Sequence, residues 1–497
     1  MTTRIVTTRT MPQAWEQLWS SSPNSKVLSQ VGPGPVDTST SESICAAELE
    51  SKSRSIARKL LGAGLTKGDR ILVSAEPSIE MAGLIVGALR ACITVVPFNT
   101  AYVSREIEHI VRDCRPKAAA VDNPSRGQLI RDAAISSGFD TCVFNMSIGI
   151  EEPPSQFDPD LDTALPGDIA LIAYTSGTTG VPKGAMLTHS NLAANALAIC
   201  ETWRWTNEDS LLLSLPMFHG HGLCNGLFGT LMAGSHAFII PKFDPTVICT
   251  LAPVSGATMF FGVPTMYKRL VEHNSVGNLS GLRLCVSGSA ALPATLFEQF
   301  RAATGHRPLE RYGATEILMA LSNPFDGERR PGSVGLPLPG VEVKLVQGEV
   351  IVRSPMVFSG YLNMPEATED ALSQGWYKTG DLAEISEDGY FTIMGRSKDL
   401  IITGGLNVYP REVEEVLGMH PAVREIAVVG EPSAQWGEQV TAYIVADDSY
   451  DSGTVLSQSI VEFASTRLAP FKCPKEIRYL DSLPRNALGK VTKHLLG

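Results

Sequence analysis

The first half of the chain alternates between segments with helical hydrophobic periodicity and short apolar segments typical of buried strands. Residues 46–61 carry apolar side chains on one helical face, and Gly62 follows where a glycine often ends a helix. Residues 70–74 have the pattern of a strand, residues 80–92 that of an apolar helix, and residues 93–97 that of the next strand. Strands joined by one crossover helix with short connections lie parallel in a sheet. The pattern therefore predicts an α/β fold with mostly parallel sheets.

The middle of the chain repeats this theme. Residues 169–174 form a continuous apolar run, as expected for a strand buried on both faces. A loop rich in Gly, Thr and Ser follows, and a helix is expected to begin near residues 188–190. Residues 247–283 again combine strand and helix patterns. We therefore expect a large N-terminal domain built of layered α/β subdomains.

A different pattern begins near residues 395–399 and continues to the C-terminus. Pro410 suits the first position of a helix, because its missing N–H has no helical partner there in any case. The expected elements are a strand at residues 400–402, a turn at Gly404 and Gly405, a helix from Pro410, and strands at residues 426–429 and 440–445. This arrangement predicts a small C-terminal α+β domain.

Charge and cysteine content argue against several classes of protein. The formal net charge is -11 and there is no long run of Lys or Arg, which argues against a nucleic-acid partner. The nine cysteines form no CxxC pair and their number is odd. We therefore expect buried thiols in a reducing compartment, with neither a disulfide framework nor a zinc site.

Two segments bear on where the protein works. Residues 210–241 contain no Asp, Glu, Lys or Arg, a length that could span a membrane. They also contain Pro216 and three histidines, so a buried strand–loop–helix region is the better interpretation. The N-terminus lacks the apolar block of a secretory signal, and its first carboxylate is Glu16. We expect a cytoplasmic protein without a transmembrane segment, with import into an organelle as the alternative.

The segment at residues 175–184 is the most informative one for chemistry. Its glycines allow the backbone to approach an anion closely, and its hydroxyls and one ammonium group add hydrogen-bond donors. The spacing does not match a Walker A loop. The sequence predicts a binding loop for a polyphosphate, and the alternative is a flexible glycine-rich surface loop. The candidate phosphate ligands are Thr175, Ser176, Gly177, Thr178, Thr179, Gly180 and Lys183.

Four further motifs follow this loop in a fixed order. They are RYGATE at residues 311–316, YKTGDL at 377–382, GRSKD at 395–399 and PRNALGK at 484–490. Together the five motifs resemble those of the adenylate-forming superfamily, which includes acyl- and aryl-CoA synthetases, beetle luciferases and peptide-synthetase adenylation domains. The resemblance extends from about Pro97 to Lys493.

This resemblance implies an ATP-dependent acyl-CoA ligase. In that reaction the carboxylate of an acid attacks the α-phosphorus of ATP, pyrophosphate leaves, and the acyl group passes to coenzyme A. The protein then has to position anions and neutralise developing charge, and it needs no nucleophile of its own. The implied domains are residues 1–395 with the ATP and acid sites, a hinge at residues 396–398, and residues 399–497 with the catalytic lysine.

The resemblance also assigns roles to residues in this numbering. The loop at residues 175–184 would hold the β- and γ-phosphates, and Glu316 would bind Mg²⁺, the hard cation that prefers oxygen ligands. The other implied roles are Thr315 at the α-phosphate, Tyr312 against adenine, Asp381 at the ribose hydroxyls, Arg396 at the ribose or phosphates, Lys490 as the catalytic lysine, Lys398 as the hinge residue, and Gly404 and Gly405 beside the CoA channel.

Within the superfamily the chain looks most like malonyl-CoA synthetases. The similar segments are residues 241–245, 262–265, 322–329 and 402–410. One residue departs from that pattern, since Ala314 stands where those enzymes carry methionine. The smaller side chain would leave room for methylmalonate or for a longer acid.

A dicarboxylic acid leaves one carboxylate unreacted inside the protein, where an unpaired charge is costly. Arg311 precedes the Tyr312 motif and could meet that carboxylate, with His219 as a second donor. The alternatives are a structural ion pair for Arg311 and a core or gate position for His219. A metal site at His219 and His221 lacks an evident third ligand.

The sequence is also compatible with other functions. The acid could be a short- or medium-chain or an aromatic monocarboxylate, or the enzyme could be an acyl-AMP ligase that loads an acyl carrier protein. An oxygenase of the luciferase type and a nucleotide-binding scaffold without chemistry are further alternatives. The sequence does not predict the oligomeric state.

Overall fold

The computed structural model describes residues 9–32, 42–146, 157–175, 182–485 and 490–496. The chain divides into two compact units. The larger unit comprises residues 1–292, 296–343 and 352–377, and the smaller unit comprises residues 293–295, 344–351 and 378–497. The division near residue 377 lies N-terminal to the hinge predicted at residues 396–398.

One sheet of the larger unit has seven strands. In spatial order they are β18 (Gly360–Tyr361), β8 (Lys183–Thr188), β7 (Ile169–Thr175), β4 (Thr94–Pro97), β3 (Arg70–Ser74), β5 (Ala118–Val121) and β6 (Cys142–Asn145). The run from β7 to β6 is parallel, whereas β8 and β18 are antiparallel. The mostly parallel pairing agrees with the alternation of strand and helix patterns in this part of the sequence.

The second sheet of the larger unit has nine strands. Their order is β15 (Leu336–Pro337), β14 (Leu318–Ser322), β13 (Leu309–Ala314), β12 (Leu284–Ser287), β11 (Met259–Gly262), β9 (Ser210–Leu213), β10 (His236–Ile239), β1 (Lys26–Gln30) and β2 (Glu42–Cys45). The strands from β13 to β1 are parallel, and the outer strands β14, β15 and β2 are antiparallel. The carboxyl ends of β9, β11, β12 and β13 therefore lie along one edge.

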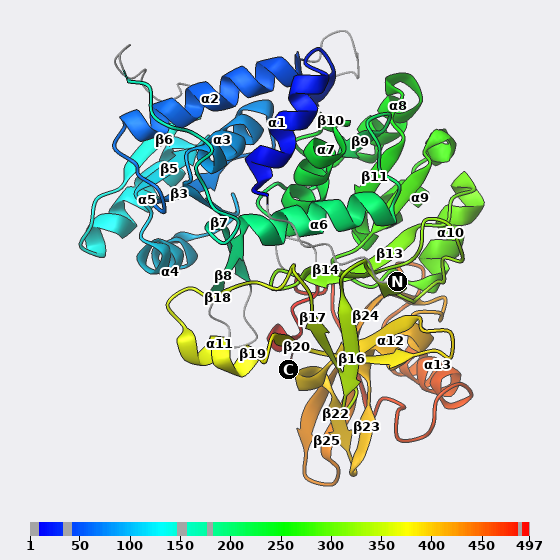
Figure 1. The fold of residues 1–497 in the computed structure, drawn as a ribbon. Helices are drawn as coiled ribbons and strands as arrows, with labels where there is room; N and C mark the ends of the chain where they lie inside the picture. The colour runs from blue at the N-terminus through cyan, green and yellow to red at the C-terminus, as the bar shows by residue number, and fades with distance from the viewer. Residues whose placement is uncertain (1–8, 33–41, 147–156, 176–181, 486–489, 497) are drawn as a thin grey trace. The chain divides into compact units, whose positions relative to one another are not determined.

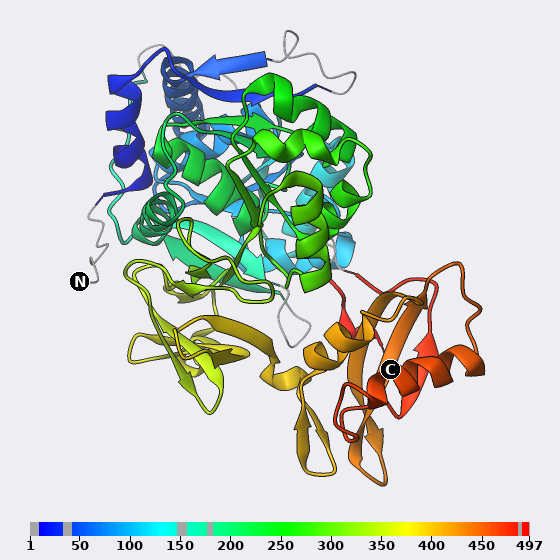
Figure 2. The same cartoon turned by 90° about the vertical axis from the view of Figure 1, so that its right-hand side faces the viewer.

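Helices cover both sheets of the larger unit (Figures 1 and 2). Two of them, α3 (Ile79–Arg90) and α6 (His189–Thr202), contact strands of both sheets. The others are α1 (Met11–Ser21), α2 (Ala46–Gly62), α4 (Ser104–Cys114), α5 (Pro124–Ser136), α7 (Phe228–Ala233), α8 (Pro245–Ser255), α9 (Pro264–Val271), α10 (Ala294–Thr304) and α11 (Pro365–Ala371), with the π-helix η1 (His221–Leu227) and the 3-10 helix η2 (Val276–Gly281). The helix α2 ends at Gly62, the residue that the sequence predicted as its stop. The chain turns at Gly64, where φ is +89° and a side chain would be strained.

A five-stranded sheet follows in the sequence, in the order β16 (Glu342–Val346), β17 (Glu349–Arg353), β20 (Trp376–Ile385) and β19 (Leu372–Ser373), with β21 (Phe391–Arg396) on β20. The smaller unit has a sheet of its own. It consists of β23 (Leu406–Val408), β22 (Ile401–Thr403), β25 (Gly437–Ala446) and β24 (Val423–Ser433), with β26 (Glu476–Tyr479) parallel to β25. Its helices are η3 (Ser397–Asp399), α12 (Pro410–Leu417), α13 (Thr454–Ser465) and η4 (Lys493–Leu495). Pro410 occupies the first helical turn as predicted.

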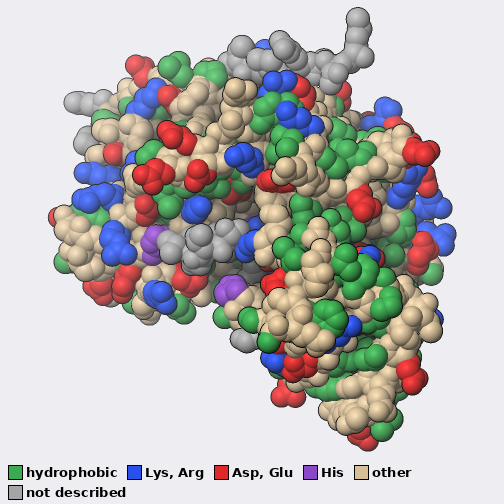
Figure 3. All heavy atoms as spheres, turned by 90° about the horizontal axis from the view of Figure 1, so that it is seen from below, with side chains coloured by type: hydrophobic (Ala, Val, Ile, Leu, Met, Phe, Trp, Pro, Cys, Tyr) green, Lys and Arg blue, Asp and Glu red, His purple; other side chains and the backbone are tan. Residues whose placement is uncertain are grey.

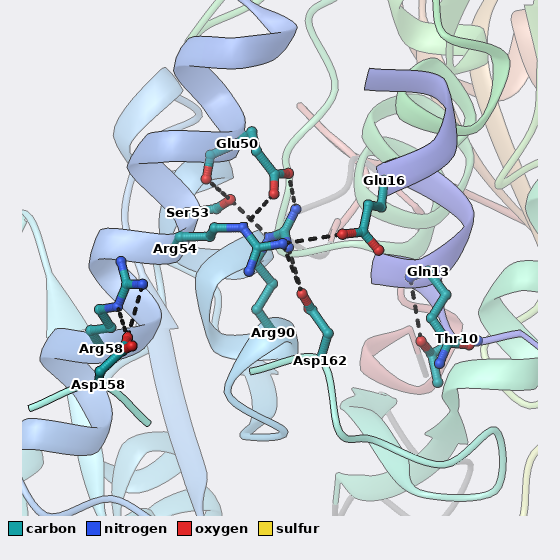
Figure 4. A network of polar contacts seen from close by, with 10 residues as sticks. All are labelled: Thr10, Gln13, Glu16, Glu50, Ser53, Arg54, Arg58, Arg90, Asp158 and Asp162. Carbon is teal, nitrogen blue, oxygen red and sulfur yellow. Dashed lines mark hydrogen bonds and ion pairs between the residues drawn. The ribbon is translucent and has the colours of Figure 1, made fainter. Parts of the chain in front are cut away.

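A buried arginine links α2, α3 and the segment before β7 (Figure 4). The Arg90 side chain is fully buried, and its Nη1 lies 2.7 Å from Asp162 Oδ2. Its Nε donates to Ser53 Oγ at 3.0 Å, and it forms a further ion pair with Glu50. A buried guanidinium is tolerated when carboxylates and hydrogen bonds compensate it, and here the compensation comes from α2 and from the segment before β7.

The apolar region at residues 210–241 forms β9, η1, α7 and β10. No helix among the described residues is long and apolar enough to cross a membrane. On the face shown in Figure 3, basic and acidic side chains are interspersed over the surface.

Candidate functional site

The predicted phosphate loop connects two antiparallel strands. Thr175 at the end of β7 pairs with Lys183 at the start of β8, and Thr175 Oγ1 donates to the Lys183 carbonyl at 3.5 Å. His109 Nε2 lies 2.9 Å from the Pro182 carbonyl on the same stem. The strands thus hold both ends of the loop. Five of its predicted ligands lie outside the described residues: Ser176, Gly177, Thr178, Thr179 and Gly180.

The side chain of Tyr361 lies between Lys183 and Glu316, the predicted metal ligand. Lys183 Nζ lies 5.0 Å from the centre of the Tyr361 ring, and the Tyr361 hydroxyl donates to Glu316 Oε1 at 2.8 Å. Glu316 is buried at 8% exposure, and its backbone carbonyl accepts from Phe358 N. Tyr361 was not predicted from the sequence, because it lies on a two-residue strand outside every motif. The second oxygen of Glu316 could bind a cation beside phosphate oxygens.

The RYGATE motif extends along β13 and just beyond it. Tyr312 pairs with Leu321 and Ala314 with Leu318 of β14, and Thr315 follows at the strand end. Tyr312, Ala314 and Thr315 are all partly exposed. This places the three predicted contacts in one short segment, next to the buried Glu316.

Arg311 lies at the carboxyl edge of the nine-stranded sheet. It directly follows Glu310, which pairs with Ser287 at the end of β12. Its side chain is buried at 7% exposure, and its Nε and Nη2 have no hydrogen-bond partner among the described residues. Burial lowers the pKa of Arg311 to about 10. In open α/β sheets ligands bind outside the carboxyl ends of the strands, so a buried cation without an ion-pair partner here points to an anionic ligand.

Two histidines lie within electrostatic range of this arginine. Burial and the Arg311 charge lower the pKa of His219 to about 4. The same two influences, with His219 in addition, hold the pKa of His221 well below its usual value. His221 Nδ1 lies 3.4 Å from Ser289 Oγ, and its Nε2 has no partner among the described residues. Both imidazoles are therefore neutral hydrogen-bonding groups at neutral pH.

The smaller unit brings together the second group of predicted residues. Asp381 and Arg396 face each other across β20 and β21, with Arg396 Nε 3.0 Å from Asp381 Oδ1. Lys490 lies close enough for both to influence it. The protein around its ammonium group lowers the pKa of Lys490, Arg396 acts in the same direction, and Asp381 opposes both. Predicted ribose and α-phosphate contacts from segments far apart in sequence thus lie together within this unit.

The remaining predicted residues also lie in the smaller unit. Lys398 lies in the short 3-10 helix η3, directly after β21. Gly404 and Gly405 form the turn between β22 and β23 with φ values of +57° and +79°. A Cβ on Gly404 would lie 3.2 Å from the Trp436 ring.

The described residues contain no cluster of three or more His, Cys, Asp or Glu side chains suited to a metal. Mg²⁺ in nucleotide sites usually takes one or two protein carboxylates together with phosphate oxygens.

Two family models match this chain in sequence. The model described as "AMP-binding enzyme" matches residues 23–362, and the "AMP-binding enzyme C-terminal domain" matches residues 412–490. The chain belongs to the AMP-binding enzyme family. The first match contains the predicted phosphate loop and the RYGATE motif, and the second ends at Lys490.

Individual relatives of this AMP-binding enzyme are CoA ligases. A malonate–CoA ligase of Arabidopsis thaliana is 37% identical over 482 residues, covering 88% of this chain and 79% of the relative. A long-chain-fatty-acid–CoA ligase of Bacillus subtilis is 34% identical, covering 87% and 86% respectively. The ATP-bound crystal structure of MatB from Rhodopseudomonas palustris has a TM-score of 0.88 and 37% identity, with 98% of each chain covered.

These similarities confirm three predictions from the sequence. The chain is a member of the adenylate-forming superfamily, it has the α/β architecture predicted for the larger domain, and it is an acid–thiol ligase. Sequence reasoning did not find the contributions of Gly288, Ser289 and Tyr361, and it considered His221 only as a metal ligand. None of these residues carries a recognisable motif, and only the folded sheet edge brings the first two to Arg311 and His221.

Proposed function

We propose that this AMP-binding enzyme activates malonate or a related small dicarboxylate as an acyl-adenylate and transfers the acyl group to coenzyme A. The observation that carries the proposal is the buried guanidinium of Arg311 at the carboxyl edge of the sheet, whose Nε and Nη2 have no hydrogen-bond partner among the described residues. A distal carboxylate would meet this cation through charge-assisted hydrogen bonds. A purely apolar acid would leave the charge uncompensated.

Neutral His219 is the second proposed contact to the acid. The backbone N–H of His221 donates to His219 Nδ1 at 3.3 Å, so the proton of the neutral ring resides on Nε2. His219 can therefore donate a hydrogen bond to a carboxylate oxygen. The name of one of the relatives supports the same substrate class, because the Arabidopsis thaliana enzyme is a malonate–CoA ligase.

We propose the following contacts for the nucleotide. We assign the phosphates to the loop at residues 175–184 with Lys183, adenine to Tyr312, and the ribose to Asp381 and Arg396. Glu316 would hold Mg²⁺, which neutralises phosphate charge, and Thr315 and Lys490 would act at the α-phosphate. The pairing of Asp381 with Arg396 and the nearness of Lys490 support a common role for these three.

The proposed domains are residues 1–395 and 399–497, with the hinge at residues 396–398. We further propose that the hinge at Lys398 lets the smaller domain exchange Lys490 for the Gly404–Gly405 turn between the two half-reactions. The left-handed backbone of both glycines supports a turn that can pass close to a pantetheine chain. The proposed setting is the cytoplasm, supported by cysteines that form no disulfide among the described residues, and import into an organelle is the alternative.

One alternative to this proposal concerns the acid, and another concerns the acceptor of the acyl group. The similarity to a long-chain-fatty-acid–CoA ligase supports a monocarboxylate as the second candidate for the acid. An acyl carrier protein in place of CoA would make the protein an acyl-AMP ligase.

A panel of acids separates these functions. The protein is incubated with ATP, Mg²⁺, CoA and one of malonate, methylmalonate, succinate, acetate, a medium-chain fatty acid or benzoate, and the products are identified by mass. Malonyl- or methylmalonyl-CoA with AMP and pyrophosphate is the expected result. Thioesters of monocarboxylates alone would contradict the role of Arg311, and an adenylate without thioester would point to a carrier protein.

Two variants sharpen the same experiment. Arg311→Met should raise the KM for the dicarboxylate by about tenfold or more and change the KM for acetate little, because only the dicarboxylate presents a second charge. Ala314→Met should narrow the range of accepted acids by filling space beside Tyr312. An unchanged range would show that Ala314 does not border the acid.

A further inference from the structure

We propose that Gly288 is a positioning residue that holds the Arg311 guanidinium in place and thereby sets the preference for dicarboxylates over monocarboxylates. This inference rests on the proposed function of Arg311 and adds a second residue that determines specificity. Gly288 follows directly after β12, and the sequence gives no sign of its role.

The guanidinium occupies the space that a side chain at residue 288 would need. A Cβ built on Gly288 would lie 2.3 Å from Arg311 Nε, 2.4 Å from Cζ and 2.8 Å from Nη2. All three of its nearest atoms belong to Arg311. The planar group thus lies directly against the glycine backbone, with Nε and Nη2 left without partners among the described residues.

The backbone of Gly288 does not itself require glycine. Its φ lies outside the left-handed range, and its N–H donates to the Gly262 carbonyl at 3.3 Å, which extends the pairing of β12 with β11. Alanine can adopt such a conformation without strain. The glycine is therefore needed for the close approach of Arg311 rather than for the turn.

Two other tightly packed glycines of the larger unit, Gly222 and Gly313, differ in this respect. A Cβ on Gly222 would lie 2.2 Å from the Pro216 carbonyl oxygen, and one on Gly313 would lie 1.9 Å from the Leu318 carbonyl oxygen. Those contacts involve backbone, which cannot move without disturbing the fold. At Gly288 the obstacle is the far end of a flexible side chain, so alanine displaces the guanidinium and leaves the backbone intact.

The next residue connects the same turn to the histidines. Ser289 has a φ of 68°, and its hydroxyl lies 3.4 Å from His221 Nδ1. The dipeptide at the end of β12 therefore contacts both the cation and one imidazole of the proposed carboxylate site. A shift of Arg311 changes where a distal carboxylate can be bound, while the reacting carboxylate is served by other residues.

The test is Gly288→Ala in the full-length enzyme, with KM and kcat measured for malonate and for acetate as thioester formation. We expect the KM for malonate to rise by about tenfold or more, with the KM for acetate changed by less than about threefold. Gly281→Ala serves as the matched control, because a Cβ there meets nothing within 4 Å. A thermal unfolding scan should give closely similar midpoints for both variants.

The double variant Gly288→Ala/Arg311→Met tests the coupling. If Gly288 acts only through Arg311, the glycine substitution has no further effect on the malonate KM once the guanidinium is gone. Equal losses for malonate and acetate, an unchanged malonate KM, additive effects in the double variant, or failure of Gly288→Ala to fold would each overturn the inference. An Arg311→Met enzyme that still prefers malonate would instead overturn the proposed function.

Discussion

A single backbone hydrogen bond determines the tautomer of His219. Because His221 N–H donates to His219 Nδ1, the neutral ring carries its proton on Nε2 and acts as a donor. The Arg311 charge and burial together keep the pKa of His219 at about 4, so the ring stays neutral throughout the physiological range. The proposed site thus combines one full positive charge with a neutral donor, which suits a single carboxylate.

This leads to a prediction for His219→Gln and His219→Leu. The glutamine amide can donate from a position similar to Nε2, so the KM for malonate should rise by only a few-fold in this variant. In His219→Leu it should rise by about tenfold, because a buried carboxylate loses a donor. The measurement is initial-rate kinetics with malonate for both variants.

The pH dependence gives an independent check on the same residue. Malonate itself titrates, so the informative quantity is the KM of His219→Gln divided by that of the unaltered enzyme. A ring with a pKa near 4 loses its charge well below pH 5.5, and the ratio should stay constant between about pH 5.5 and pH 8. A ratio that increases as the pH falls would mean that His219 becomes cationic and binds the acid more tightly.

Among the secondary-structure elements, α2 and α3 depend on one another through a buried charge. Arg90 near the end of α3 is paired with Asp162 and Glu50, and it lies 5.6 Å from the centre of the Trp19 ring of α1. Burial raises the pKa of Asp162, while Arg90 and Arg54 oppose that increase. Since α3 contacts both sheets, this network stabilises the elements that carry the site.

Arg90→Met should destabilise the larger unit by about 3–5 kcal/mol, because two carboxylates lose their buried partner. Arg58→Met is the control, since Arg58 pairs with the exposed Asp158 and should contribute no more than about 1 kcal/mol. Urea unfolding followed by tryptophan fluorescence gives both values. The loss in the free energy of unfolding caused by Arg90→Met should become smaller at lower pH. Without Arg90, Asp162 takes up a proton more readily and no longer carries an unpaired buried charge. Equal effects of the two substitutions would contradict this account.

For the whole molecule, the central question is how two units serve two half-reactions. The residues proposed to bind the acid lie in the larger unit, and Asp381, Arg396 and Lys490 lie together in the smaller one. The proposed hinge residue Lys398 lies between β21 and β22 in a helix of only three residues. A change of backbone dihedrals there would require few contacts to break.

Lys398→Pro should therefore slow one half-reaction much more than the other. Proline fixes φ near −65° and restricts the preceding residue, so one of two backbone states becomes inaccessible. Pyrophosphate release measures the rate of adenylation, and thioester formation measures the rate of acyl transfer. In Lys398→Pro one of these two rates should fall about tenfold or more below the other. Lys398→Ala controls for loss of the charge. Normal rates for both half-reactions in Lys398→Pro would remove the hinge from the mechanism.

The sequence by itself determined the α/β class and, through the ordered motifs, the family. Hydrophobic periodicity and glycine-containing motifs are local properties, so β3 matches its predicted range and Pro410 begins its helix. Local patterns could not reveal α1, whose tryptophans are buried only by contact with other helices. They did predict the end of α2 at Gly62, two residues before the left-handed Gly64 at which the chain turns.

Only the tertiary structure decided which polar atoms lose contact with water and which segments meet. Arg311 lies in a recognised motif, yet its charge becomes significant because the fold buries it without an ion-pair partner among the described residues. Gly288 lies directly after β12 and His221 at the start of η1, and the fold brings both close to Arg311. Burial and nearness depend on residues far apart along the chain, so local sequence patterns do not predict them.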